Sequence, residues 1–140
     1  MFSALDISTS ALVAQRTRLD TISSNLANMS SLRDENGDVQ PYKARYVIFQ
    51  TDDQLKTPGG AVGVKVASVE TETVDPLYRY EPNHPLAIKS GDKQGYVAYP
   101  NVNMTTEFVD ALEATRAYEA NIGVMEVSKN LSQQTLRILA

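Results

Sequence analysis

The lone histidine and one cluster of acids are the residues of this chain whose types could support catalysis. His84 lies in a proline-rich loop, and the sequence offers it neither a nucleophile nor a group to orient its ring. Glu107, Asp110 and Glu113 could form a carboxylate site, but they stand at the start of a predicted helix, whose dipole favours acids without any catalytic purpose. We therefore expect a locally hydrogen-bonded histidine and no enzyme. A carboxylate site around Glu107 and Asp110 is the alternative.

Two further segments have the composition of ligand sites without the spacing. Residues 34–38, DENGD, combine acids and a glycine as a calcium loop does, but the glycine comes one place early and Arg45 stands where a bidentate acid is needed. The glycines of residues 59–63 lack phosphate-binding spacing, and no predicted helix follows them. With one histidine and no cysteine, a zinc site would need mainly carboxylates. We expect no metal and no cofactor.

The composition limits the classes of partner. The 140 residues are 42% hydrophobic and 21% charged, which is typical of a globular chain, and the net charge of −4 leaves no basic patch. Nucleic acid and anionic membrane are therefore poor partners. The apolar runs are too short for insertion into a bilayer. The N-terminal residues lack the pattern of a cleaved secretory signal, so we expect any export to use another route.

A long helix is predicted for residues 105–140. The stretch has no proline, and its acids come early and its bases late, as the helix dipole favours. A coiled-coil seam repeats every seven positions, at Ala117, Val124, Leu131 and Ile138. A second apolar set lies largely off that seam: Phe108, Leu112, Tyr118, Ile122, Met125, Leu136 and Leu139. Two stripes indicate several packing neighbours, although an ordinary amphipathic core helix explains this stretch, taken alone, slightly better.

Residues 3 to about 29 form the second predicted long helix. Ile22 lies between two of its leucines, which stand seven apart at Leu5, Leu12, Leu19 and Leu26. We expect the leucines from position 12 onward to pack against the seam residues from position 124 onward, within one chain or between subunits. Residues 21–32 carry no charge, which is unusual for a solvated helix face and favours contact with protein on several sides.

The pattern between the helices changes to that of strands. Alternation is clearest where Val62, Val64 and Val66 share one face. A loop is expected over residues 51–61, and Asn36-Gly37 fits a type I′ turn. The predicted strands cover residues 42–50, 62–74, 78–80 and 96–99.

These elements predict an α+β fold. Residues 1–32 and 104–140 form a terminal helical domain, in which the two helices pair as an antiparallel coiled coil. Residues 33–103 form a small β-rich insert between them. Each helix is therefore the obvious packing partner of the other.

Three stretches resemble the flagellar basal-body rod protein family. Residues 5–28, LDISTSALVAQRTRLDTISSNLAN, look like its N-terminal motif, and residues 41–49, PYKARYVIF, are similar to a second motif. The third is the most specific and narrows the resemblance to the C-type proteins of the proximal rod. It consists of YEPNHP at 80–85, GYVAYPNVN at 95–103 and EFVDALEATRAYEAN at 107–121. The chain departs from the family pattern at residues 29–31 and looks individual over 32–40 and 86–94.

The resemblance implies a structural subunit that assembles with itself and with other rod proteins into the helical drive shaft, which transmits torque from motor to hook. The terminal helices would form the inner layer of a tube with the β-unit outside. Implied partners include the junction of the rod base with the membrane ring and export gate. The implied location is the rod that crosses the periplasm, reached through the flagellar type III apparatus without a cleaved signal. The alternatives are a free-standing coiled-coil binding module and another axial protein of the same family.

The residues expected to pack the helices together and against neighbours are large and apolar. They are Leu5, Leu12, Leu19, Ile22, Leu26, Phe108, Leu112, Tyr118, Ile122, Val124, Met125, Leu131 and Ile138. One antiparallel partner covers one stripe, and tertiary packing supplies most of the stability of a helix in a protein. We therefore expect the terminal helices to be partly ordered in an isolated subunit and fully ordered on assembly.

Overall fold

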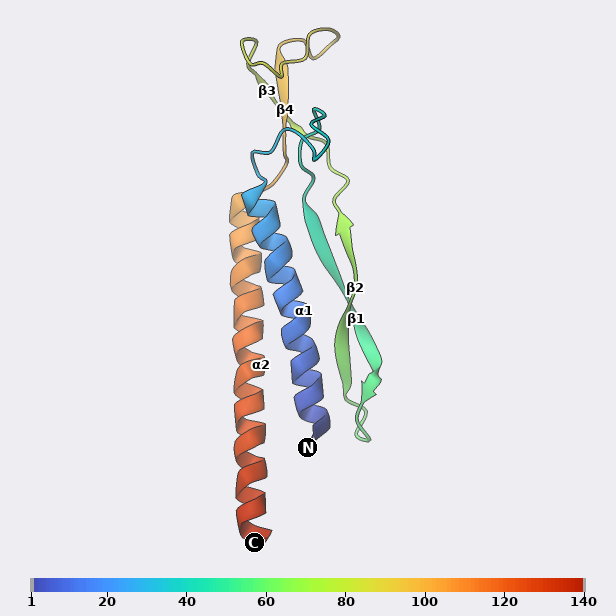
Figure 1. The fold of residues 1–140 in the computed structure, drawn as a ribbon, viewed down its shortest axis with the longest axis vertical. Coiled ribbons are helices and arrows are strands. Elements are labelled where there is room, and N and C mark those ends of the chain that lie inside the picture. Colours follow the sequence, from blue (N-terminus) through green and yellow to red (C-terminus); the bar gives the residue numbers. More distant parts are fainter. Residues whose placement is uncertain (1, 140) are drawn as a thin grey trace.

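A computed structural model describes residues 2–139, with side chains from residue 4 onward. Within that range a long helix lies at each end and the strands lie between them (Figure 1). The elements are α1 (Phe2–Ala27), β1 (Arg45–Lys56), β2 (Val62–Thr71), β3 (Leu77–Tyr80), β4 (Tyr96–Tyr99) and α2 (Met104–Leu139). The α+β class with two long helices packed against each other is therefore confirmed.

The helix α1 is the middle element of the molecule (Figure 1). The helix α2 lies antiparallel along one side of α1, and the hairpin of β1 and β2 lies along the other. The hairpin of β3 and β4 projects beyond the ends of the helices. Because α2 has 36 residues and α1 has 26, α2 extends past the N-terminal end of α1. So α1 is covered on two sides, whereas α2 has a partner on one side and for part of its length.

Small and polar side chains make much of the contact between α1 and α2. Ala14 and Ala114 are buried. Arg18 lies 3.5 Å from the carboxylate of Asp110 and 3.3 Å from that of Glu113. The covered stripe of α2 includes Glu107, Ala111, Ala114, Tyr118, Asn121, Met125, Ser128 and Ser132. Alanines on both helices allow the backbones to approach closely, because the interaxial distance depends on the side chains at the contact.

The predicted seam of α2 is wrong within the chain. Val124, Leu131 and Ile138 are 50%, 55% and 84% exposed, so they do not pack against α1. The partners predicted for them on α1 are half-buried: Leu12, Leu19 and Leu26. The stripe of α2 that faces α1 also repeats every seven residues, but it lies three positions earlier in the sequence than the predicted seam, at Ala114 instead of Ala117. An ion pair and a hydrogen bond from α1 to the first two turns of α2 fix the rotation of α2 about its own axis. The two stripes have the same period, so periodicity alone could not show which of them faces α1.

The strands β1 and β2 form an antiparallel hairpin. β1 continues to Lys56, beyond the predicted end at residue 50, because a register shift between Asp52 and Lys56 takes up extra residues without ending the pairing. β2 shows the predicted alternation, with Lys65 exposed, and ends at Thr71 instead of residue 74. Its half-buried residues include Val62, Val64 and Val66.

The strand β2 lies close to α1 at Ser10. The Val64 amide donates a hydrogen bond of 3.1 Å to Ser10 Oγ. Gly63 is buried, and a Cβ at this position would meet Leu55 Cβ at 2.9 Å and Ser10 Oγ at 3.1 Å. The missing side chain of Gly63 therefore allows the hairpin to lie against α1.

The turn at Asn36-Gly37 is not of type I′. That type requires a positive φ at both central residues, and among the described residues a positive φ occurs at glycines alone, including Gly37 at 85°. The Gly37 amide donates to Asp34 O at 3.0 Å, which closes a turn with Asp34 first and Gly37 fourth. The Asp34 side chain accepts the amides of Asn36 and Asp38, which stabilises the turn without a second left-handed residue.

Aromatic side chains stabilise the hairpin of β3 and β4, which agrees with the predicted strands at 78–80 and 96–99. Tyr80 and Tyr96 contact each other edge to face, with ring centroids 5.3 Å apart. Lys93 Nζ lies 3.5 Å from the centroid of the Tyr78 ring. Val97 is buried. Contacts between rings and cations thus supplement a core too small to support this unit by itself.

Asn25 joins three segments that lie far apart in the sequence. Its side chain is 1% exposed. Its Oδ1 accepts from the Arg45 amide at 2.9 Å and from the Tyr42 hydroxyl at 3.0 Å. Its Nδ2 donates to Arg45 O at 2.8 Å and to both oxygens of the Glu107 carboxylate at 3.2 Å. One amide therefore fixes the end of α1, the entry to β1 and the first turn of α2 relative to one another.

The Glu107 carboxylate is partly withdrawn from solvent at this junction. Burial raises the pKa of Glu107, the hydrogen bonds from Asn25 oppose that rise, and the charges of Asp110 and Glu72 add to it. Among the described residues, no cation lies within ion-pair distance of Glu107. The junction therefore holds a carboxylate whose charge is compensated by an amide and not by a base.

Replacing Asn25 should destabilise the subunit strongly. Asn25→Ala leaves the N–H and C=O of Arg45, whose bonds to Asn25 are part-buried, without these partners, and each group costs about 1–3 kcal/mol when it loses its bond. We expect a loss of about 3 kcal/mol or more in the free energy of unfolding, measured by urea denaturation. Ser23→Ala, at an exposed position of the same helix, should change it by less than about 0.5 kcal/mol. Equal losses in the two variants would contradict the role given to Asn25.

A side chain at position 63 should separate the hairpin from α1. Gly63→Ala places a Cβ against Leu55 and Ser10, and overpacking of this kind costs about 1–3 kcal/mol, more than the entropy that alanine restores. Gly59→Ala is the control, because its nearest neighbour would be Thr57 Oγ1 at an ordinary 3.8 Å. Urea denaturation of both variants measures the difference. If Gly63→Ala matched Gly59→Ala, the hairpin would not depend on this close approach.

The raised pKa of Glu107 predicts a pH dependence with a defined sign. As pH rises from below the ordinary pKa of a glutamate, the unfolded chain loses this proton first, so the contribution of Glu107 to stability falls until the pH passes its raised folded pKa. The amide of Glu107→Gln does not titrate. Its unfolding free energy, compared with that of the unmodified chain at each pH, should therefore improve as the pH rises above the ordinary pKa of a glutamate, and should level off once the raised folded pKa is passed. A difference that stays flat over this range would argue against the burial of the charge.

Candidate assembly surfaces

The residues singled out for catalysis have structural partners. His84 Nδ1 accepts the Leu86 amide at 3.1 Å, so the prediction of a locally bonded loop histidine is confirmed. The acids at the start of α2 each contact a side chain of α1: Glu107 with Asn25, and Asp110 and Glu113 with Arg18. No nucleophile is bonded to any of these groups in the described residues. The arrangement packs helices and does not assemble acid–base chemistry.

The loop compared with a calcium site uses its carboxylate internally. Asp34 Oδ1 accepts two backbone amides, from Asn36 at 3.0 Å and Asp38 at 2.9 Å. Across residues 2–139, no three side chains of the His, Asp or Glu type gather closely enough to hold a metal ion. Neither helix in this range is long and apolar enough to cross a bilayer.

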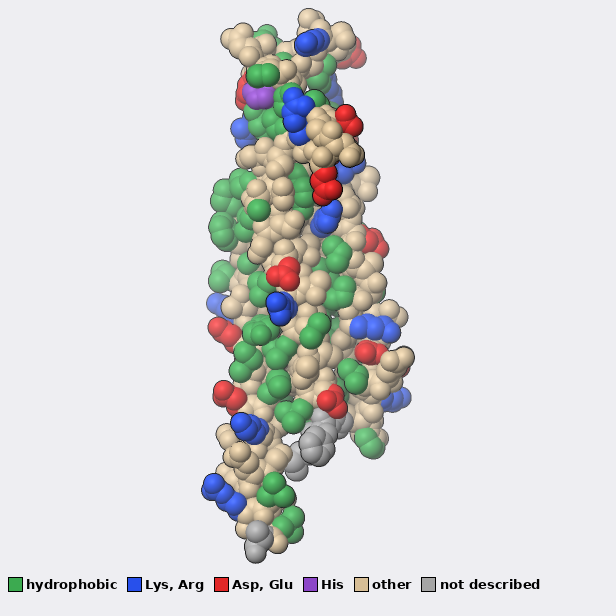
Figure 2. Space-filling view, in the orientation of Figure 1, with side chains coloured by type: hydrophobic (Ala, Val, Ile, Leu, Met, Phe, Trp, Pro, Cys, Tyr) green, Lys and Arg blue, Asp and Glu red, His purple; other side chains and the backbone are tan. Residues whose placement is uncertain are grey.

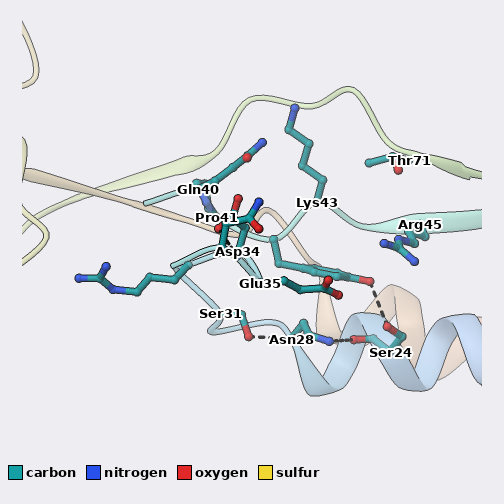
Figure 3. A pocket seen from close by; sticks show the side chains of 13 residues that line it. Ser24, Asn28, Ser31, Asp34, Glu35, Gln40, Pro41, Lys43, Arg45 and Thr71 are labelled. Carbon is teal, nitrogen blue, oxygen red and sulfur yellow. Dashed lines mark hydrogen bonds between the residues drawn. The ribbon is translucent and has the colours of Figure 1, made fainter. Parts of the chain in front are cut away.

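A polar hollow of about 600 Å³ opens where α1 ends (Figure 3). Ser24, Asn28 and Ser31 line one side, and the loop before β1 lines the other. The charged side chains on its walls are of both signs: Arg33, Lys43, Arg45, Asp34 and Glu35. Such walls can receive a polar loop of another protein, but they lack the apolar lining of a small-molecule pocket.

A second hollow, which we call the α1–β1 groove, has an apolar floor. It measures about 490 Å³ and lies between α1, β1 and the start of α2. Its hydrophobic lining includes Ile22, Ala44, Val47 and Phe49. Three acids also line it, Glu72, Glu107 and Asp110, together with Arg18 and Arg45. Arg18 is already bonded to Asp110 and to Glu113. The remaining charges on the groove wall are those of Glu72 and Glu107 and the single positive charge of Arg45.

Most of the large hydrophobic residues of α2 point away from α1. Figure 2 shows hydrophobic side chains along the length of this helix and at its free end. This outer face of α2 comprises Met104, Phe108, Val109, Leu112, Ile122, Val124, Val127, Leu131 and Ile138. Leu136 and Leu139 are also exposed, but they continue the covered stripe past the end of α1. The other residues predicted to pack the helices are buried or half-buried: Leu5, Leu12, Leu19, Ile22, Leu26, Tyr118 and Met125. Eleven exposed large hydrophobic residues on one helix mark a surface for protein contact.

Sequence reasoning did not single out the residues that position these surfaces. Asn25 was one of several small polar residues in the uncharged stretch 21–32, and nothing in its type distinguishes it from Asn28. The spacing of Gly63 from its neighbouring glycines excludes a phosphate-binding loop, and nothing in the sequence indicates that Gly63 lies against α1. The usable signal was the absence of charge in 21–32, which did indicate contact on several sides.

Comparison with known proteins gives consistent matches over the whole chain. The family described as flagella basal body rod protein matches residues 5–31, and the C-terminal family of the flagellar basal body rod FlgEFG proteins matches residues 93–138. Flagellar basal-body rod protein FlgC of Borreliella burgdorferi is 41% identical, over 99% of this chain and 97% of the relative. The FlgC proteins of Salmonella typhimurium and Bacillus subtilis are 42% and 38% identical, over 99% and 98% of this chain and 97% of each relative.

These matches decide between the alternatives that the sequence left open. The family is structural, so the carboxylate-enzyme alternative is excluded. Rod proteins form an assembly with other rod components, which explains why an apolar helix face is left without a partner in the single chain. Similarity at about 40% over both full lengths shows the family. The chain belongs to the flagellar basal-body rod protein family and is a structural subunit of the rod of the bacterial flagellum.

Proposed function

We propose that α1 and α2 form the inner layer of a helical tube, in which the outer face of α2 is buried against neighbouring subunits. The observation that carries this proposal is the exposure of eleven large hydrophobic residues on a helix that has one partner. Fully burying such a side chain stabilises by about 1.5–3 kcal/mol, so completing the burial of half-exposed ones adds on the order of 1 kcal/mol each. Contacts of that size, summed over the helix, can hold a subunit in an assembly.

In this arrangement the helical domain of residues 1–32 and 104–140 lies inside, and the β-rich insert of residues 33–103 lies outside. The hairpin of β1 and β2 covers the side of α1 opposite α2, which supports an order of layers from helix to hairpin (Figure 1). Torque is transmitted by many interlocked subunits, because rotation of one helix pair loads the neighbours that bury its outer face. No single residue carries the torque.

The similarity to FlgC proteins supports a place in the proximal rod, which crosses the periplasm. Its partners there are further copies of the chain, other rod proteins, and the junction of the rod base with the membrane ring and export gate. Export uses the flagellar type III apparatus without a cleaved signal. An unfolded chain suits that route, since helices that gain their packing from neighbours become fully ordered on arrival.

A charge on the outer face of α2 should block incorporation without unfolding the subunit. Leu112 is 60% exposed, so Leu112→Asp buries nothing unfavourable in the isolated chain but places a carboxylate in the proposed contact. We expect co-purification with basal bodies to fall at least about tenfold. Val69→Asp, at an exposed position of β2, is the matched control and should incorporate nearly normally. Equal incorporation of both variants would contradict the proposed inner layer.

Amide hydrogen exchange on the purified subunit tests whether assembly completes the order of the helices. We expect fast exchange over roughly the first and last thirty residues, most of all in the part of α2 that extends past α1, and slower exchange in β2. The same amides should be protected in isolated basal bodies. Strong protection across both helices in a dilute monomer would contradict coupled ordering and would favour a compact, independently stable helical pair.

A further inference from the structure

We infer that an exposed row of residues on α1 packs against an exposed row on α2 of a neighbouring copy of this chain, with the two helices antiparallel. The inference rests on the proposed function, because it names the surface that covers part of the outer face of α2. The α1 row consists of Thr9, Val13, Arg16, Asp20, Ser23 and Ala27. The α2 row consists of Val109, Leu112, Arg116, Glu119, Gly123 and Glu126.

Both rows form continuous faces of their helices. The members of each row stand alternately three and four residues apart, which places them on one side of a helix. All members of both rows are exposed in the single chain. This spacing averages 3.5 residues, the period at which two helices keep a common line of contact. The α1 row and the α2 row therefore have the geometry to meet each other along their length.

Charge complementarity selects the direction and the register of this contact. In one antiparallel register Arg16 lies opposite Glu119, and Asp20 lies opposite Arg116. Among the described residues, none of these four charged groups takes part in an ion pair within the chain. In a parallel arrangement of the same rows, both residues of α1 would face a residue of their own charge sign, which opposes association. A displacement by seven residues in either direction would leave Asp20 without a cation opposite it.

The same register gives a role to Gly123. A glycine inside a helix destabilises it, and a Cβ at Gly123 would meet no other part of the described chain within 4 Å. Nothing within the chain therefore makes use of the missing side chain. In the inferred contact Val13 lies opposite Gly123, and Val13 is a large hydrophobic residue that is 62% exposed in the single chain. The absence of a side chain at Gly123 leaves room on the helix surface for this valine.

The register also brings the uncharged end of α1 to the most apolar part of the α2 row. Ser23 lies opposite Leu112, and Ala27 lies opposite Val109. The leucine and the valine are 60% and 57% exposed in the single chain. Small uncharged side chains can be covered by such residues without the cost of desolvating a charge. The contact therefore explains why residues 21–32 carry no charge on a side of α1 that neither α2 nor the hairpin covers.

The inferred contact displaces neighbouring copies along the helix axis. Within the chain, Asn25 contacts Glu107, and Arg18 contacts Asp110 and Glu113. Opposite the same levels of α1, the neighbouring α2 presents residues about three to six positions later, a displacement of roughly 5–9 Å at about 1.5 Å per residue. A contact between two different surfaces that also displaces the copies repeats into a helical array and not into a flat ring.

Cysteine cross-linking tests the register directly, because the chain has no cysteine of its own. The double variant Ala27→Cys with Val109→Cys is expressed in place of the native chain, and isolated basal bodies are treated with a short bis-maleimide. We expect a ladder of dimers, trimers and larger species, with the 27–109 link identified by mass spectrometry. Each single variant should give no ladder. The matched control, Ala27→Cys with Val127→Cys, should also give none, since Val127 is exposed but lies about five helical turns from Val109.

Charge exchange provides a second, independent measurement. Asp20→Arg should lower the yield of the 27–109 link at least about tenfold, because it sets a second cation against Arg116 of the neighbouring copy. Adding Arg116→Asp to the same chain should restore most of the yield, since the pair is then re-formed with its charges exchanged. Both positions are exposed, so circular dichroism should show an unchanged fold in each variant.

The outcomes separate this contact from the function on which it rests. If the chain enters basal bodies but gives no 27–109 link, the contact is overturned and the rod function stands. A ladder from the 27–127 control would indicate the parallel arrangement and would overturn the antiparallel register. If Asp20→Arg has no effect, or Arg116→Asp gives no rescue, the charge pairing is overturned. If the unmodified chain does not co-purify with basal bodies, the proposed function itself fails.

Discussion

The buried amide of Asn25 is the interaction on which the arrangement of the chain depends. It binds both backbone groups of Arg45, the Tyr42 hydroxyl and the Glu107 carboxylate. Hydrogen bonds of this kind are directional, so they fix an angle as well as a distance. The first turn of α2 therefore meets α1 with one defined rotation, and every residue further along α2 inherits it. The rotation that buries Ala114 is the same one that turns Val124 and Leu131 outward.

This constraint divides the roles of the two helices. The buried hydrophobic residues of the described chain are few and mostly small, and include Ala14, Ile22, Ala44, Val97 and Ala114. A core of that size contributes little of the free energy that a chain of this length needs to fold alone, whereas eleven large hydrophobic residues of α2 remain exposed and can be buried by neighbouring subunits. The polar contact of α1 with α2 thus supplies orientation, and the apolar contacts left open supply stability when neighbours arrive. Folding and assembly are in this sense one process.

The sequence allowed the elements to be predicted but not the rotation of α2. Helix propensity and the absence of proline located both helices, and the alternation around Lys65 located β2, because these are properties of short segments. The predicted packing of the α2 seam against α1 was wrong because α2 has two stripes with the same period. Contacts of Asn25 and Arg18 with the start of α2 decide which stripe faces α1, and these contacts join residues more than eighty positions apart in the sequence. The type I′ turn failed because the Asp34 side chain stabilises a turn in which Asn36 keeps a negative φ. Contacts between distant residues decided each case.

The unequal lengths of the helices connect this geometry to the purpose of a rod. Two helices of equal length that covered each other fully would make a closed hairpin with equivalent ends. Here α1 and α2 overlap in part, and the last turns of α2 extend past the N-terminal end of α1 (Figure 1). Different surfaces at the two ends give the subunit a direction, and a directional contact repeats into an open structure instead of a closed pair. The buried Ala14 and Ala114 and the ion pairs of Arg18 with Asp110 and Glu113 hold α1 and α2 together at several points, so a load on one helix passes to the other.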